Sequence, residues 1–170
     1  HGGVIGTQNK YIALIRDTLL NVARIFPKLL SFFDFYHPWQ ITNGLIDKSL
    51  YPNKANGIVI SQPNLDLKVD NKSFDQYIGY NFALIVFDQN EKLLNDIKAL
   101  ESSKIFEDNI YLINKDSPFN EDSNFIKWKR DNKISAVIIR PDRHVYGCCD
   151  NESMITKVDE LNKKLISELT

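Results

Sequence analysis

The fold of this chain is decided by nine consecutive residues, Ile138-Ile139-Arg140-Pro141-Asp142-Arg143-His144-Val145-Tyr146. The apolar residues at both ends predict two strands, and the polar centre predicts the turn that joins them. Proline presets φ for the first central position of a type I turn, and aspartate tolerates the conformation of the second. The stretch therefore predicts a β-hairpin with Pro141 and Asp142 at its tip.

A C-terminal helix is predicted after the hairpin, and two further strands are predicted before it. The helix is indicated by apolar residues at steps of three and four from Met154 to Leu169, with Asn151 as its N-cap. The apolar run 82–87 predicts a strand covered on both faces, and 110–113 predicts the next strand.

Two more helices are predicted between these strands. The first follows a cap at Asp88 or Asn90, and its buried stripe consists of Leu93, Leu94, Ile97 and Leu100. The second follows a capping stretch at 121–123 and carries Phe125, Ile126 and Trp128. The resulting order is strand, helix, strand, helix, strand, strand, helix. With right-handed crossovers this order predicts an α/β fold, a mixed sheet flanked by helices that resembles thioredoxin.

A domain boundary is predicted after residue 56. Residues 57–170 form the predicted thioredoxin-like domain, which begins with a short strand candidate at 57–60, an alternating edge strand at Leu65, Leu67 and Val69, and a helical turn stopped by Gly79. Residues 1–56 form a predicted helical lead-in and linker. The linker is indicated by the turn residues within 40–56.

The lead-in contains two apolar features. Tyr11, Ile15, Leu19, Val22 and Phe26 share one face of a predicted helix. The segment Leu29 to Trp39 then carries many aromatic residues without a clean period. Such a segment needs burial, either against the following domain or against a partner outside this chain. A homodimer through Leu29 to Trp39 is one way to bury it.

Composition narrows the class of protein. The chain has 170 residues, of which 43% are hydrophobic and 25% charged, and its net charge is -1. These values are typical of a soluble globular protein that needs no disulfide or metal. The balanced charge argues against nucleic acid as a partner, and no apolar run is long enough to span a membrane. We expect a cytoplasmic location.

Thiol redox chemistry is not expected, although the fold is one that often carries it. A redox site needs cysteines at a helix N-terminus, where the chain instead reads Asp88-Gln89-Asn90-Glu91, and no proline stands at 132–135 before the next strand. Cys148 and Cys149 are adjacent in a predicted strand and should point to opposite faces. We expect one to be buried and the other exposed or partly exposed.

Other chemistry-bearing residues show no functional spacing. His1, His37 and His144 show no metal-ligand spacing, and the glycines at 2, 3 and 6 follow no strand. Glu101, Asp108 and Glu121 read as solvated carboxylates. The run 127–130, Lys-Trp-Lys-Arg, reads as an amphipathic helix with its charges in water. No catalytic, cofactor-binding or metal-binding residue is therefore predicted in this chain.

Three stretches carry a family resemblance. Gly57 to Leu65 with Gln62-Pro63, Phe74 to Gly79 running into Phe82, and the Arg140-Pro141-Asp142 turn with its closing helix resemble the C-terminal region of FAD-dependent aromatic hydroxylases. Within that family the likeness is greatest to the 3-(3-hydroxyphenyl)propionate hydroxylases. Residues 3–33 resemble the helical segment that follows the flavin domain in these enzymes.

The resemblance implies that this chain is the tail of a larger enzyme. Such an enzyme would bind FAD, take hydride from NAD(P)H and hydroxylate a phenolic ring with O2, in aromatic compound catabolism. Its flavin and substrate sites would lie upstream of residue 1, in domains against which residues 1–56 would pack. Two alternatives stay open, a free-standing thioredoxin-like redox protein and a non-enzymatic interaction module.

Overall fold

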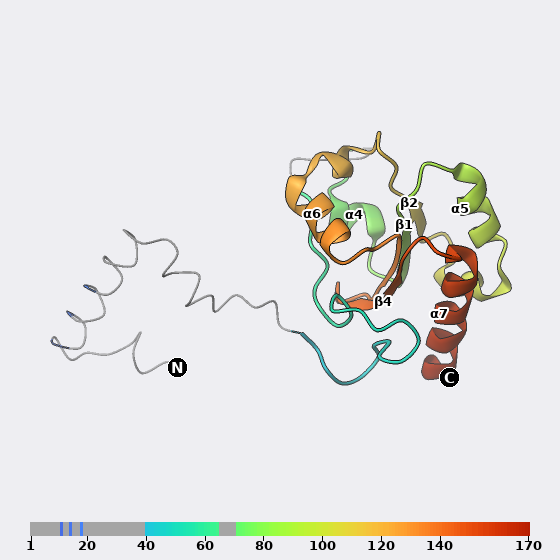
Figure 1. The fold of residues 1–170 in the computed structure, drawn as a ribbon, viewed down its shortest axis with the longest axis horizontal. Helices are drawn as coiled ribbons and strands as arrows, with labels where there is room; N and C mark the ends of the chain where they lie inside the picture. Colours follow the sequence, from blue (N-terminus) through green and yellow to red (C-terminus); the bar gives the residue numbers. More distant parts are fainter. Residues whose placement is uncertain (1–10, 12–13, 15–17, 19–39, 65–70) are drawn as a thin grey trace. The chain divides into compact units, whose positions relative to one another are not determined.

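The computed structural model describes residues 40–64 and 71–170, together with Tyr11, Leu14 and Thr18 (Figure 1). The chain divides into two compact units, His1–His37 and Pro38–Thr170. Tyr11, Leu14 and Thr18 are helical, within the helix predicted from Tyr11 to Phe26. The rest of that helix, the segment Leu29 to Trp39 and the predicted strand at Leu65 to Val69 lie outside the described residues.

A four-stranded mixed sheet forms the centre of the second unit. Its strands are β1 (Ala83–Val86), β2 (Ile110–Leu112), β3 (Ala136–Ile139) and β4 (Val145–Cys149), in the spatial order β2-β1-β3-β4. β1 and β2 are parallel, whereas β3 runs antiparallel to both β1 and β4. The sheet is mixed, as predicted, so the fold-class prediction is confirmed.

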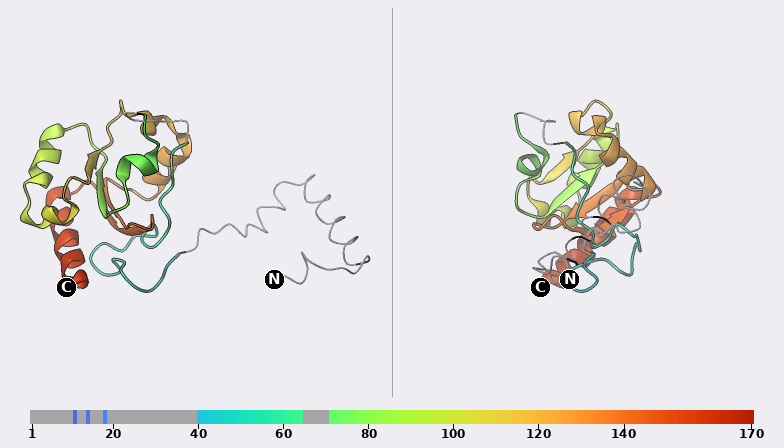
Figure 2. Two further views of the ribbon diagram at one scale, coloured as in Figure 1. Left: turned by 180° about the vertical axis from the view of Figure 1, so that it is seen from behind. Right: turned by 90° about the vertical axis from the view of Figure 1, so that its left-hand side faces the viewer.

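Helices cover both faces of the sheet. α4 (Phe74–Ile78) and α6 (Ser123–Asp131) lie on one side, and α5 (Glu91–Lys98) and α7 (Met154–Leu169) lie on the other (Figures 1 and 2). Two 3-10 helices that were not predicted complete the connections, η2 (Glu101–Phe106) and η3 (Pro118–Glu121). The strands are therefore sandwiched between two helical layers.

The core consists of two apolar clusters, one on each face. All four residues of β1 and of β3 are buried, as expected for strands covered on both sides. In β4, Val145 and Cys148 join the cluster under α4 and α6, while Tyr146 and Cys149 join the cluster under α5 and α7. A register shift opposite Ile138 and Ile139 lets Val145 and Cys148, three residues apart, share one face.

Side-chain caps set the start of two helices. Asn90 accepts from the backbone N–H of Lys92 and begins α5, and Asp122 accepts from Phe125 and begins α6. The predicted cap of the last helix is wrong. α7 begins at Met154 after Ser153, which adopts a left-handed conformation with φ 52° and makes no side-chain cap bond. Asn151 therefore lies two residues before the N-cap.

Candidate functional site at the β4 edge

The turn of the decisive hairpin has the predicted residues at its tip. The backbone N–H of Arg143 donates to the carbonyl of Arg140 (3.0 Å), and that of Arg140 donates to the carbonyl of His144 (2.9 Å). Pro141 and Asp142 therefore occupy the two central positions. Arg143 follows in the left-handed region with φ 68°, which makes the loop a three-residue hairpin connection. Glycine is the usual residue at such a position, and nothing in the sequence pattern predicted an arginine there.

The side chains of this turn bind one another and the preceding loop. The Arg140 guanidinium pairs with the Asp142 carboxylate (2.7 Å) and donates to the carbonyl of Leu45 (3.1 Å). Burial raises the pKa of Asp142, but the backbone N–H of His144 and the charge of Arg140 outweigh it and leave the pKa below 3.8. The His144 ring lies against the same aspartate. His144 is thus largely enclosed rather than free in solvent.

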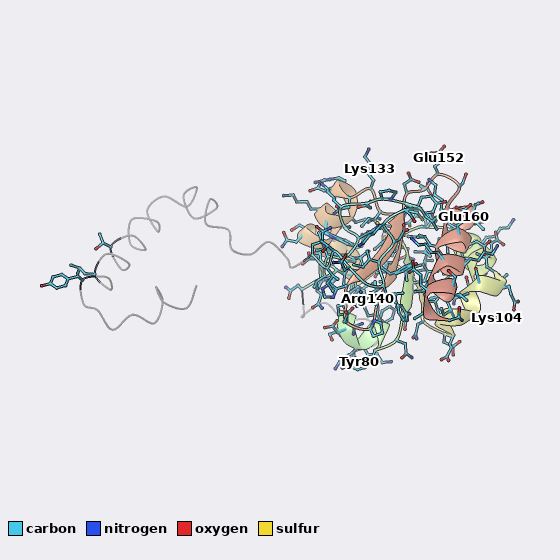
Figure 3. All side chains as sticks on the ribbon, turned by 90° about the horizontal axis from the view of Figure 1, so that it is seen from below. Tyr80, Lys104, Lys133, Arg140, Glu152 and Glu160 are labelled. Atoms are coloured by element: carbon cyan, nitrogen blue, oxygen red, sulfur yellow. The ribbon has the colours of Figure 1, made fainter. Side chains whose placement is uncertain are left out.

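Arg143 ties the turn to α4. Its Nε lies 2.8 Å from Asp75 Oδ1, its Nη2 donates to the backbone carbonyl of Asp75 (3.1 Å), and its side chain is only 12% exposed. The guanidinium also lies 5.7 Å from the centre of the Tyr80 ring, which projects from the surface with 79% of its area exposed (Figure 3). The turn is therefore held from both sides, by residue 45 and by α4.

Residues 57–60 cover the outer edge of β4. Gly57 donates to Val145 (2.8 Å), Val145 donates back to Ile58 (2.9 Å), and Ile60 donates to Arg143 (2.9 Å). Val59 forms an isolated bridge with His144, so this strand candidate is present in shortened form. We call β4 with residues 57–60 the sealed edge of the sheet.

Residues 40–56 continue this cover. Ile41 donates to the carbonyl of Gly57 (2.8 Å), and Asp47 donates to the carbonyl of Tyr146 (2.7 Å). At Gly57 (φ 79°) a side chain would place its Cβ 2.2 Å from the carbonyl oxygen of Ile41. The segment expected to be a linker therefore contacts the sheet directly. The predicted boundary at residue 56 stays a prediction, although the compact unit begins at Pro38.

A buried carboxylate holds the loop that follows. Asp47 accepts from the backbone N–H groups of Ser49, Leu50 and Tyr51, and its Oδ1 lies 2.6 Å from the Lys164 ammonium on α7. Burial raises the pKa of Asp47, but Lys164 and the three N–H groups outweigh it, so the pKa lies below 3.8. Tyr51 also donates to Glu160 on α7, which fastens the other end of the loop.

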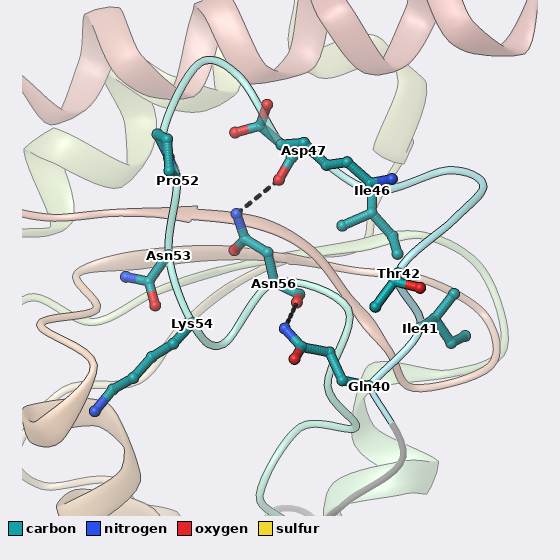
Figure 4. Close-up of a pocket in the computed structure, with 10 residues that line it drawn as sticks. Gln40, Ile41, Thr42, Ile46, Asp47, Pro52, Asn53, Lys54 and Asn56 are labelled. Atoms are coloured by element: carbon teal, nitrogen blue, oxygen red, sulfur yellow. Dashed lines mark hydrogen bonds between the residues drawn. The ribbon is translucent and has the colours of Figure 1, made fainter.

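A surface hollow of about 470 Å³ lies between the two arms of this segment (Figure 4). Gln40 donates to the carbonyl of Asn56 (3.0 Å), and the Asn56 amide donates to the carbonyl of Asp47 (2.9 Å), so these polar groups are engaged in holding the walls together. Lys48 and Lys54 stand at its rim. The lining contains amides, ammonium groups and a carboxylate, but no side-chain nucleophile next to a base.

The two cysteines also lie on β4. They point to opposite faces as predicted, but the expectation that one is exposed is wrong, because helices or loops cover both faces of the strand (1% and 4% exposed). Burial raises the pKa of each thiol to about 12. Cys148 donates to the side-chain oxygen of Asn56 (3.3 Å). At neutral pH both residues are therefore protonated thiols within the core.

The start of α5, where a thioredoxin-type nucleophile would stand, is occupied by capping groups. Asp88 accepts from the backbone N–H groups of Gln89 and Asn90, and Asn90 accepts from Lys92. Ser135 precedes β3 and pairs by its backbone with Phe87 and Cys149. These side chains stabilise a helix terminus and offer no nucleophile.

The basic helical run 127–130 departs in part from the prediction. Trp128 packs against the core and stacks on Phe125, as expected. Lys129, however, lies over the Phe87 ring at 4.8 Å, and burial lowers its pKa despite the nearby Asp88. One of the charges expected in water is therefore half-buried on an aromatic ring.

The described part of the chain contains neither a metal-binding cluster nor a membrane-spanning helix. In residues 40–64 and 71–170, no group of three or more His, Cys, Asp or Glu residues is close enough to hold a metal. His1 and His37 lie outside the described residues. No helix within the described part of the chain is long and apolar enough to cross a membrane. The cytoplasmic location stays a prediction.

Comparison with known proteins identifies a family for most of the chain. Residues 57–164, more than half of the sequence, match the family model of the HcaD C-terminal domain. The match supports the general part of the resemblance, that this chain is the C-terminal domain of a flavoprotein. The narrower likeness to 3-(3-hydroxyphenyl)propionate hydroxylase stays a prediction.

Two further comparisons add less. The search of curated proteins gives no match. A solved structure of the substrate-free form of the rebeccamycin biosynthetic enzyme REBC is 15% identical, with a TM-score of 0.41, and the match covers 91% of this chain. This chain spans 28% of that enzyme's chain. A structural likeness at this level supports no argument about function.

Proposed function

Because this chain belongs to the HcaD C-terminal domain family, we propose that it is the accessory tail of an FAD-dependent aromatic-ring monooxygenase. The parent enzyme would hydroxylate a phenolic compound with NAD(P)H and O2, as 3-(3-hydroxyphenyl)propionate hydroxylases do. FAD and the nicotinamide would bind the upstream domains. The tail would act in packing, subunit contact or closure of the substrate pocket.

The family match carries this proposal, and the geometry of the chain agrees with a structural role. Backbone hydrogen bonds fasten the segment 40–60 to the sheet, and the Asp47–Lys164 ion pair fastens it to α7. The position of a thioredoxin-type nucleophile is taken by the capping groups of α5, and both thiols have a pKa of about 12. Such groups stabilise a fold and do not transfer electrons.

Flavin titration of two proteins tests the proposal. The full-length protein should bind FAD and consume O2 and NAD(P)H in the presence of a phenolic compound. The 170-residue chain alone should leave flavin fluorescence unchanged. Tight FAD binding by the chain alone would move the cofactor site into the tail. If the full-length protein bound no FAD, the proposal that the parent is an FAD-dependent monooxygenase would be wrong.

A disulfide-reduction assay tests the redox alternative. The chain should reduce a protein disulfide no faster than a variant in which Cys148 and Cys149 are both replaced by serine. A cysteine-dependent rate would instead support a free-standing thioredoxin-like redox protein.

A further inference from the structure

The outer edge of β2 differs from the sealed edge, because no described strand pairs with it. Leu84 donates to the carbonyl of Asn109, and Ile113 donates to the carbonyl of Val86. Backbone groups alternate between the two sides of a strand, so those of Leu112 point away from β1. We call this side of β2 the open edge.

A groove of about 370 Å³ runs along the open edge. Tyr77 of α4 and Tyr111 of β2 form one wall, with their ring centres 4.8 Å apart. α5 forms the other wall, above the backbone of β2. An added strand could therefore reach the backbone of Leu112 while its side chains meet aromatic groups on one side and α5 on the other.

The wall formed by α5 has an ordered charge pattern. Glu91, Leu94, Asn95 and Lys98 line the groove at steps of three, one and three, so they occupy one face of the helix. The acidic residue stands at the N-terminal end and the basic residue at the C-terminal end, and both are exposed. Among the described residues neither has a salt-bridge partner.

We propose that the open edge binds a second copy of this chain, with the two β2 strands antiparallel across a two-fold axis. In that arrangement the two α5 helices also run antiparallel. Glu91 of each copy then faces Lys98 of the other, and the central Leu94 and Asn95 face their counterparts. A surface that is complementary to itself in this way is what an isologous dimer requires.

The charge order favours a second copy over an extended peptide from another protein. A peptide would be held chiefly through backbone hydrogen bonds, which require no particular charge at the two ends of α5. Charge reversal at either end of α5 should therefore have little effect on a peptide site, and the double variant should show no recovery of binding. In the dimer, each substitution is present in both copies and disrupts two Glu91–Lys98 pairs, and the second substitution restores both. This pattern of loss and recovery distinguishes the dimer from a peptide complex.

The experiment is a charge-swap cycle on the 170-residue chain, read by sedimentation equilibrium. Lys98→Glu alone and Glu91→Lys alone each place like charges opposite each other. Each should raise the dimer Kd about tenfold, because two symmetry-related pairs of surface strength are lost. The double variant Glu91→Lys with Lys98→Glu should return the Kd to near its original value.

The double variant also separates the interface from helix stability. It places a cation at the N-terminus of α5 and an anion at its C-terminus, which is unfavourable for the helix dipole in the monomer. Recovery of the dimer would therefore come from the restored pairs. Lys92→Glu is the matched control, because Lys92 is exposed on the same helix but does not line the groove, and it should leave the Kd unchanged.

Two results would overturn the proposal. One is a chain that sediments with its monomer mass of 19.6 kDa at every concentration reached. The other is a dimer whose Kd is the same in the parent chain and in all three swap variants, which would place the contact elsewhere, for instance at Leu29 to Trp39.

Discussion

The two edges of the sheet are built in opposite ways. At the sealed edge, β4 is covered by residues 57–60 and fastened through Asp47 to α7. At the open edge, β2 ends the sheet and leaves the backbone of Leu112 directed outwards. Unpaired edge strands invite association with other chains, so natural proteins usually cover them. The difference teaches that, within the described residues, one edge serves the fold of the chain and the other is left without a paired strand.

Removing the cover should have the largest effect. A chain of residues 57–170 retains the whole family match but loses the segment that holds Ile46, Asp47 and Ala55, all buried. We expect it to lose much of the ~5–15 kcal/mol that stabilises a domain. A chain of residues 40–170 is the control and should unfold cooperatively in a thermal melt followed by circular dichroism. Equal melting midpoints would show that the cover is dispensable.

Asp47→Ala should have the next largest effect. It leaves the Lys164 ammonium and three backbone N–H groups without their carboxylate, which should cost about 3–5 kcal/mol in the free energy of unfolding. Urea denaturation of the variant and the parent chain measures this difference. A loss below about 1 kcal/mol would mean that the clasp contributes little more than a surface ion pair.

The same aspartate predicts a pH dependence. Its pKa in the folded chain lies below the value of 3.8 expected in the unfolded chain. The stabilisation is therefore complete above pH 3.8 and is lost as the pH falls through the folded pKa. Asp47→Asn should remove this part of the acid destabilisation, measured as unfolding free energy against pH. An unchanged slope would assign acid sensitivity to other carboxyls.

Glycine substitutions compare the cover with a loop beside it. Gly57→Ala places a Cβ against the carbonyl oxygen of Ile41, at a position where φ is 79°. Gly44 also has a positive φ, 99°, but its Cβ would have open space around it. Both variants carry a conformational cost of about 1–2 kcal/mol. Gly57→Ala should cost clearly more than Gly44→Ala in a urea melt, because only it also has the clash. Equal losses would mean that Ile41 can withdraw without cost.

The smallest effect is expected at the open edge. Asn95→Ala changes an exposed side chain in the groove, and the unfolding free energy of the dilute chain should change by less than about 0.5 kcal/mol. A loss above 1 kcal/mol would mean that this edge contributes to the fold of the single chain, contrary to the comparison.

Local signals in the sequence predicted most of the fold. The start of β4 was predicted, because Pro141 and Asp142 define the turn and the apolar residues after it define the strand. Asn90 was also among the predicted caps, because the side chain of an N-cap bonds to a backbone N–H only two residues later. The mixed sheet flanked by helices followed from the order of the elements and the handedness of the crossovers.

Contacts between distant residues were not predictable. Asp47 and Lys164 are 117 residues apart, and neither has a neighbour in the sequence that marks a buried pair. Gly57 was placed at the start of a strand candidate, whereas the close approach of the Ile41 carbonyl oxygen is what requires glycine there. The two cysteines were expected to differ in exposure because no local pattern showed that both faces of β4 are covered.

The open edge had a partial signature. Glu91, Leu94 and Lys98 could be placed on one face of a helix from their spacing, but which face meets the edge of the sheet depends on the packing of α5. No local pattern in the sequence indicates how α5 is rotated against the sheet.

Amide hydrogen exchange measured by NMR on the dilute chain tests the contrast between the two edges most directly. The N–H of Val145, bonded to Ile58, should exchange only through global unfolding, while the N–H of Leu112 should exchange orders of magnitude faster. Raising the chain concentration should slow Leu112 and leave Val145 unchanged. Equal protection of the two amides in the dilute chain, or rapid exchange at Val145, would contradict the account.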